Sequence, residues 1–161
     1  MTGGGPAHGA EVFSLVRCCF AFQWQAGTLI WALDAAYCHR RPGPEADTFR
    51  GLHARLTGLW LDVADRLQAD VGRILDEWSS EQVWHLDIHD RSHPAGDWPA
   101  ELGWWTYLGT NRHLSLAPLT EITAQARRLP NGALLVELLT DPAAVDPLRY
   151  QDIHTRWLQA P

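Results

Sequence analysis

The segment Gly103-Trp104-Trp105-Thr106-Tyr107-Leu108-Gly109 decides how the rest of this chain is interpreted. Its aromatic residues and Thr between two glycines predict a β-strand. Successive residues of a strand face opposite sides, so Trp104, Thr106 and Leu108 form one row and Trp105 and Tyr107 the other. A core on one side cannot bury both rows. Either the sheet is covered on both faces, or Trp105 and Tyr107 form a partner-binding surface, since Trp and Tyr are enriched at interface hot spots.

The residues that follow predict two helices and a further strand. The range 119–129 reads as a short helix. Pro130-Asn131-Gly132 is a turn signal that leads into an apolar strand over 133–139. Asp146 is a suitable N-cap, and Pro147 suits the first position of a last helix. The apolar side of that helix is expected to carry Leu148, Ile153, Trp157 and Leu158.

A long amphipathic helix is predicted over residues 47–78, with Asp47 as its N-cap. Apolar residues recur there at spacings of three and four. Such a helix would be about 45–50 Å long at about 1.5 Å per residue. Gly58 or Gly72 is expected to mark a bend or a break. The stripe consists of Phe49, Leu52, Leu56, Leu59, Trp60, Val63, Leu67, Val71, Ile74, Leu75 and Trp78.

Three more segments complete the predicted elements. Residues 83–89 alternate, which predicts a half-buried strand with Trp84, Leu86 and Ile88 inward. Residues 12–22 read as a strand buried on both faces, and residues 28–37 as a strand or a short helix. The fold class is therefore α+β: a largely antiparallel sheet of four to five strands with one long, bent or straight, helix and two shorter ones. Residues 1–10 are expected to be a disordered tail, and 11–161 a single domain.

Composition limits the classes of partner. The chain has 161 residues, nine Trp, no Lys and a formal net charge of −6. This charge argues against binding nucleic acid, which needs a basic face, and is compatible with a basic protein partner. The apolar run over 12–33 is interrupted by Arg17, Gln23, Gln25 and Gly27, so no membrane span is expected. Three cysteines, two of them adjacent, do not make a disulfide framework, and a cytoplasmic location is expected.

The run His85-Leu86-Asp87-Ile88-His89-Asp90-Arg91-Ser92-His93 raises the question of a metal site. On a strand, His85 and His89 would be about 13 Å apart, too far to share one ion. Asp87 with His85, or with His89, could share one. The alternative, a solvated polar face that meets a partner, is the reading we adopt, so no metal and no cofactor are expected.

Motifs for catalysis are not found in the sequence. It holds no GxSxG, no phosphate-binding glycine loop and no HExxH. Glu77 and Glu81 could pair, but no pattern places them in a pocket. The chain is therefore expected not to be an enzyme.

The string Glu101-Leu102-Gly103-Trp104-Trp105-Thr106-Tyr107-Leu108-Gly109 resembles the GW-x-TYLS signature of the immunity protein 52 family. The run 134–141, which ends in Thr140-Asp141, is similar to the family's apolar strand, and 147–159 to its terminal helix. The likeness covers roughly residues 65–160. It departs at Gly109, where the family prefers Ser, and in the shorter N-terminal part.

The resemblance implies an immunity protein of a bacterial polymorphic toxin or type VI secretion system. Such a protein binds its cognate toxin and occludes it without catalysis. We expect the partner to be basic, and the contact to involve Asp87, Asp90, Asp97, Trp98, Trp105 and Tyr107. Trp98 is expected to be partly exposed, because it lies in a loop. Two alternatives stay open: a metal-dependent hydrolase that uses the His/Asp cluster at 85–93, and an adaptor subunit of a secretion apparatus. The oligomeric state is not predicted.

Overall fold

The computed structural model describes residues 42–86, 96–114, 117 and 119–160, and the backbone alone of 20–25 and 28–33. The chain divides into two compact units, Met1–Tyr37 and Cys38–Pro161. Each unit is described by itself. The predicted tail over 1–10, most of the His85–His93 run and all three cysteines lie outside the described residues.

The first unit contains a β-hairpin. Strand β1 (Phe20–Gln25) pairs antiparallel with β2 (Thr28–Leu33), in a register that sets Phe20 opposite Leu33 and Gln25 opposite Thr28. Residues 28–33 are therefore a strand, the first of the two alternatives for the range 28–37. The rest of the expected strand over 12–22 precedes the described residues.

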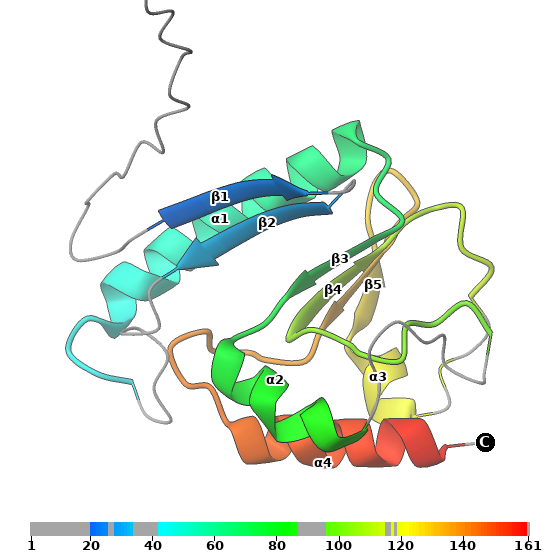
Figure 1. The fold of residues 1–161 in the computed structure, drawn as a ribbon. Coiled ribbons are helices and arrows are strands. Elements are labelled where there is room, and N and C mark those ends of the chain that lie inside the picture. Colours follow the sequence, from blue (N-terminus) through cyan, green and yellow to red (C-terminus); the bar gives the residue numbers. More distant parts are fainter. Residues whose placement is uncertain are drawn as a thin grey trace, which may run out of the picture. The chain divides into compact units, whose positions relative to one another are not determined.

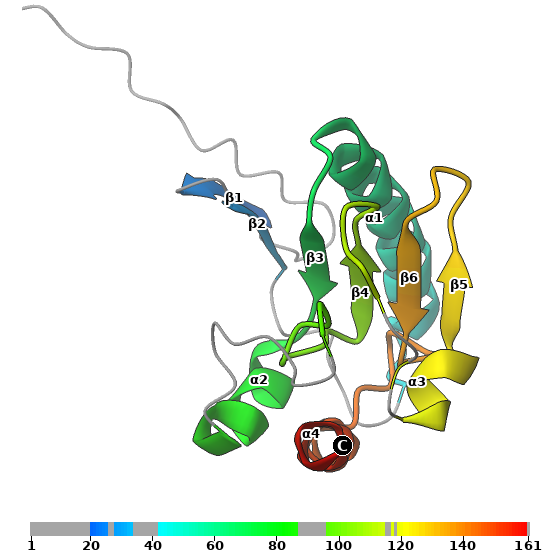
Figure 2. The ribbon, with the colours of Figure 1, turned by 90° about the vertical axis from the view of Figure 1, so that its right-hand side faces the viewer.

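The second unit is built on a four-stranded antiparallel sheet (Figure 1) with the order β3-β4-β6-β5 (Figure 2). Its strands are β3 (Val71–Ile74), β4 (Trp105–Leu108), β5 (Ala126–Arg128) and β6 (Leu134–Glu137). The central strand β4 pairs with both β3 and β6, and Thr106 lies opposite Arg73 on one side and Val136 on the other. The predicted strands over 103–109 and 133–139 are thus confirmed.

This sheet is accompanied by the helices α1 (Ala46–Arg66), α2 (Glu77–Val83), α3 (Thr120–Ala124) and α4 (Pro147–Gln159). A 3₁₀ turn, η2 (Trp84–Leu86), continues α2. The α+β class is confirmed. Asp146 caps α4 as predicted, since its carboxylate accepts from the N–H of Leu148 while Pro147 takes the first turn. None of the helices in the described ranges has the length and apolar character that crossing a bilayer requires.

The predicted helix over 47–78 is too long, because α1 ends at Arg66. Gln68 adopts a left-handed conformation with φ of 50°. The N–H of Ala69 donates to the carbonyl of Ala64 (2.8 Å), and the N–H of Gln68 to that of Asp65 (3.0 Å). This is the Schellman arrangement that ends many helices, here with Gln where Gly is usual. Neither Gly58 nor Gly72 makes the break: Gly58 lies within α1, and Gly72 within β3.

Two other predicted elements differ from the structure. Val83 ends α2 and Trp84–Leu86 is a 3₁₀ turn, so the strand predicted over 83–89 does not begin there, and its last residues lie outside the described ranges. The predicted helix over 119–129 ends at Ala124, and Ala126–Arg128 pairs with β6 as an edge strand.

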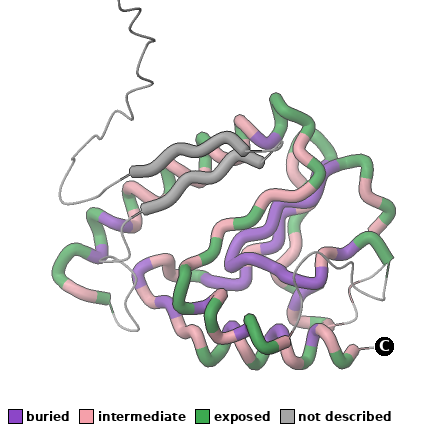
Figure 3. The backbone as a smooth tube through the Cα atoms, viewed as in Figure 1, coloured by how far each residue is buried: buried purple, intermediate pink, exposed green. Residues whose placement is uncertain are grey.

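The sheet is covered on both faces, which resolves the question posed by Trp104 and Trp105. Helix α1 lies on one side of the strands, with α2 and α4 on the other (Figures 1 and 2). On the α1 side, Trp105 contacts His53 (ring centroids 4.3 Å apart) and Tyr107 contacts Trp60 (6.4 Å). On the other side, Trp104 packs against Tyr150 of α4, with ring centroids 5.0 Å apart. Burial is therefore concentrated along the central strands (Figure 3).

The two glycines that flank β4 leave room for neighbouring backbone. A Cβ on Gly103 would come within 2.7 Å of the carbonyl oxygen of Ile74, and a Cβ on Gly109 would collide with the carbonyl of Ala69. The N–H of Gly109 also donates to the carbonyl of Asp70 (2.9 Å), which holds the two segments together. Gly109, where the resembled signature has Ser, thus has no space for a side chain.

We expect Gly109→Ser to lower the free energy of unfolding by about 1–3 kcal/mol, the usual cost of overpacking a rigid site. Gly51→Ser is the matched control, because Gly51 lies on α1 with no atom within 4 Å of the added Cβ. Denaturant titration of both variants makes the comparison. Equal stability of the two would contradict the close approach at Gly109.

Candidate functional site

The aromatic residues expected to meet a partner lie inside the protein. Trp98, Trp105 and Tyr107 are 2%, 7% and 2% exposed. Trp98 packs edge-on against Trp157 of α4, with ring centroids 5.5 Å apart and planes at 77°. The expected exposure of Trp98 is wrong, and so is the expectation that Trp105 and Tyr107 form a surface row. The coverage of both sheet faces makes these residues part of the framework.

Asp97 is exposed, as its predicted role requires, but it also has a structural role. Its carboxylate accepts from the N–H of His113 (2.9 Å), and its carbonyl accepts from the guanidinium of Arg112. Arg112 in turn pairs with Asp70 (2.7 Å). Asp97 therefore ties the loop after β4 to the loop before Trp98.

The acidic residues predicted next to His85 cannot be placed. Asp87 and Asp90 lie outside the described residues, as do His89 and His93. His85 is exposed on η2. Within the parts of the chain that are described, no group of three His, Cys, Asp or Glu side chains could hold a metal ion.

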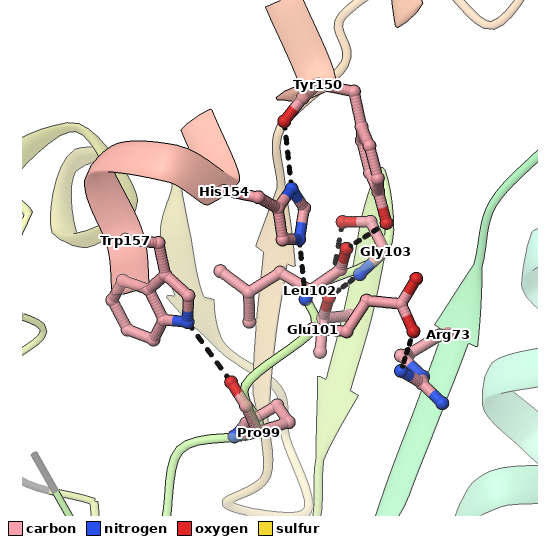
Figure 4. A network of polar contacts seen from close by, with 9 residues as sticks. Arg73, Pro99, Glu101, Leu102, Gly103, Tyr150, His154 and Trp157 are labelled. Atoms are coloured by element: carbon pink, nitrogen blue, oxygen red, sulfur yellow. Dashed lines mark hydrogen bonds and ion pairs between the residues drawn. The ribbon is translucent and has the colours of Figure 1, made fainter. Parts of the chain in front are cut away.

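The segment 99–104 is fastened to α4 by a buried polar network (Figure 4). The N–H of Leu102 donates to Nε2 of His154 (3.0 Å), and the carbonyl of Leu102 accepts from the hydroxyl of Tyr150 (2.6 Å). Nδ1–H of His154 donates to the carbonyl of Tyr150 (2.9 Å), and the indole N–H of Trp157 donates to the carbonyl of Pro99 (3.2 Å). In the described part of the chain Leu102 pairs with no strand, and its N–H and carbonyl are satisfied instead by side chains of one face of α4.

Glu101 and Thr106 complete this network with internal partners of their own. Arg73 of β3 pairs with the buried carboxylate of Glu101 at 2.6 Å. The N–H of Gly103 donates to the hydroxyl of Thr106 (2.8 Å). Burial raises the pKa of Tyr150, and the nearby charge of Glu101 adds to this effect, so the phenol stays protonated and remains a donor.

Trp104 links the network to α2. Its indole N–H lies 2.9 Å from Oδ2 of Asp76 and 3.0 Å from the hydroxyl of Ser79. The other oxygen of Asp76 caps α2 by accepting from the N–H of Ser79 (3.0 Å). One buried indole therefore holds the first turn of α2 against the framework.

The outer side of α2 and η2 carries two exposed tryptophans. Trp78 is 54% and Trp84 65% exposed, whereas Ser79 and Val83 on the inner side are fully buried. We call the exposed set the α2 surface; it consists of Glu77, Trp78, Glu81, Trp84 and His85. The apolar spacing over 47–78 and the alternation over 83–89 predict Trp78 and Trp84 as core residues, and this prediction is wrong. The signal that was missed is Asp76 followed by Glu77, a cap and an acidic first turn that start a new helix at this point.

A second feature is a hollow of about 750 Å³ between α1, the end of β6 and residues 139–142. The ion pair of Arg50 with Asp141 (2.6 Å) lies in its wall, and it lowers the pKa of Asp141. His53 lines the hollow as well. Its Nδ1 is 3.3 Å from the hydroxyl of Thr57, its Nε2 is buried without a hydrogen-bond partner among the described residues, and burial lowers its pKa.

Comparisons with known proteins add no relative: no family model, no curated protein and no solved structure matches this chain.

The geometry around His154 makes stability depend on pH. Only neutral imidazole can accept from Leu102, and burial lowers the pKa of His154 below its ordinary value of 6.5. The unfolded chain therefore binds protons that the folded chain does not. The free energy of unfolding should fall as the pH drops below 6.5, by up to about 1.4 kcal/mol per pH unit for this group.

His53 acts in the same direction, so the contribution of His154 needs its own variant. His154→Gln offers an acceptor that does not titrate, and it should show a shallower loss of stability between pH 6.5 and 4.5 than the parent chain. His53→Gln gives the matched comparison. An unchanged slope in His154→Gln would show that the network does not depend on neutral His154.

Proposed function

We propose that this chain is an immunity protein that binds a basic toxin domain in the bacterial cytoplasm and neutralises it by occlusion, without catalysis. What carries the proposal is the segment 101–109, which resembles the signature of the immunity protein 52 family. Its polar side chains are bonded within the fold: Glu101 to Arg73, Trp104 to Asp76 and Ser79, and Tyr107 to Asn131. The segment 101–109 therefore holds the fold together, and we expect the contact with the toxin to be made by other residues that it positions.

Charge supports the same proposal. The chain carries 19 acidic and 13 basic residues. Acidic groups that face a basic partner accelerate encounter and fix the register of the complex. A rigid scaffold adds to affinity because little conformational freedom is lost on binding.

Co-expression tests this proposal. The adjacent open reading frame should encode a modular protein, and its C-terminal domain is expressed in a bacterial host with and without this chain. We expect growth to be restored only when this chain is present. A matched arm uses an unrelated acidic protein of similar size, which should not protect. Cells that die equally fast with and without this chain would refute the proposal.

A further inference from the structure

We infer that the α2 surface is the contact through which this chain binds its partner, and that the partner presents a basic protein surface with an apolar recess for Trp78 and Trp84. This inference rests on the proposed function and names the site of binding. It replaces buried Trp98, Trp105 and Tyr107 as the aromatic part of the contact.

Exposure is the first argument. Two tryptophans within seven residues are each more than half exposed, although the same unit buries Trp98, Trp104, Trp105 and Trp157. Leaving two large aromatic side chains in water forgoes the apolar burial that stabilises the rest of the fold. Trp is the residue type most enriched among those that dominate interface energetics.

The charge around the two tryptophans is the second argument, and it favours a partner with a basic surface. Between Arg73 and Arg91 the sequence contains five carboxylates, no Arg and no Lys. Glu77 and Glu81 flank Trp78 on the exposed side of α2, and neither has an ion-pair partner among the described residues. By contrast, Glu101, Glu121 and Glu137 each pair with an arginine. Glu77 and Glu81, without an ion-pair partner in the described part of the chain and next to exposed indoles, complement a partner surface that carries Arg or Lys.

Rigidity is the third argument. The inner side of α2 is anchored by fully buried Ser79 and Val83, and its first turn by Asp76 and the indole of Trp104. The two tryptophans are therefore presented on a short element that is held at a fixed place against α4. A preorganised aromatic pair gives affinity at little entropic cost.

The experiment measures binding of the full-length chain to the C-terminal domain encoded by the adjacent open reading frame, inactivated for handling. Trp78→Ala and Trp84→Ala should each weaken binding at least about 30-fold, mainly through faster dissociation. Leu59→Ala is the matched control, since Leu59 is a large apolar residue of α1 that is 51% exposed. It should bind like the parent chain, and unchanged circular dichroism and Tm show that all three variants fold.

The carboxylates are tested by a different readout. The double variant Glu77→Gln/Glu81→Gln should associate several-fold more slowly at low salt, with little change in dissociation, and the difference should shrink at high salt. A purely structural role for these residues would not produce this split.

The outcomes separate the two claims. A parent chain that binds while both Trp variants bind equally well overturns the α2 surface as the contact and leaves the proposed function standing. A parent chain that does not bind the domain refutes the proposed function, and this inference with it.

Discussion

The hydrogen bonds between Leu102 and α4 are the constraint on which the rest of the second unit depends. The N–H and carbonyl of Leu102 are buried and pair with no strand among the described residues, and His154 and Tyr150 supply the acceptor and the donor. Because these residues are four apart on α4, one helix face serves both groups. Loss of either partner would leave a buried peptide group unsatisfied, which costs about 1–3 kcal/mol.

This constraint connects the aromatic segment 101–109, which is buried, to the α2 surface, which is exposed. The hydrogen bonds of Leu102 hold the backbone of this segment in place, and with it Trp104 two residues later. The indole of Trp104 donates to Asp76 and Ser79 at the start of α2. The helix then exposes Trp78 and Trp84. The motif residues are framework, and the proposed contact is formed by residues that the framework positions.

Elements with local signals were predictable from the sequence, whereas elements decided by distant contacts were not. Strand β4 follows from its aromatic residues between two glycines, and helix α4 from the Asp146-Pro147 start. The end of α1 has no such signal, because Gln68 occupies the left-handed position that Gly usually takes. Trp98 is buried by Trp157, which lies 59 residues later, and Trp78 continued an apolar spacing that belonged to α1. Residue type alone therefore could not separate framework tryptophans from exposed ones.

Native-state hydrogen exchange of the Leu102 amide tests this account most directly. If the bond to His154 is the constraint described, that amide exchanges only when the whole unit unfolds. Its opening free energy should then equal that of Leu135 in the central strand β6 and the global value from denaturant titration. Exchange of Leu102 through a low-energy local opening, while Leu135 stays protected, would contradict the central role of this contact.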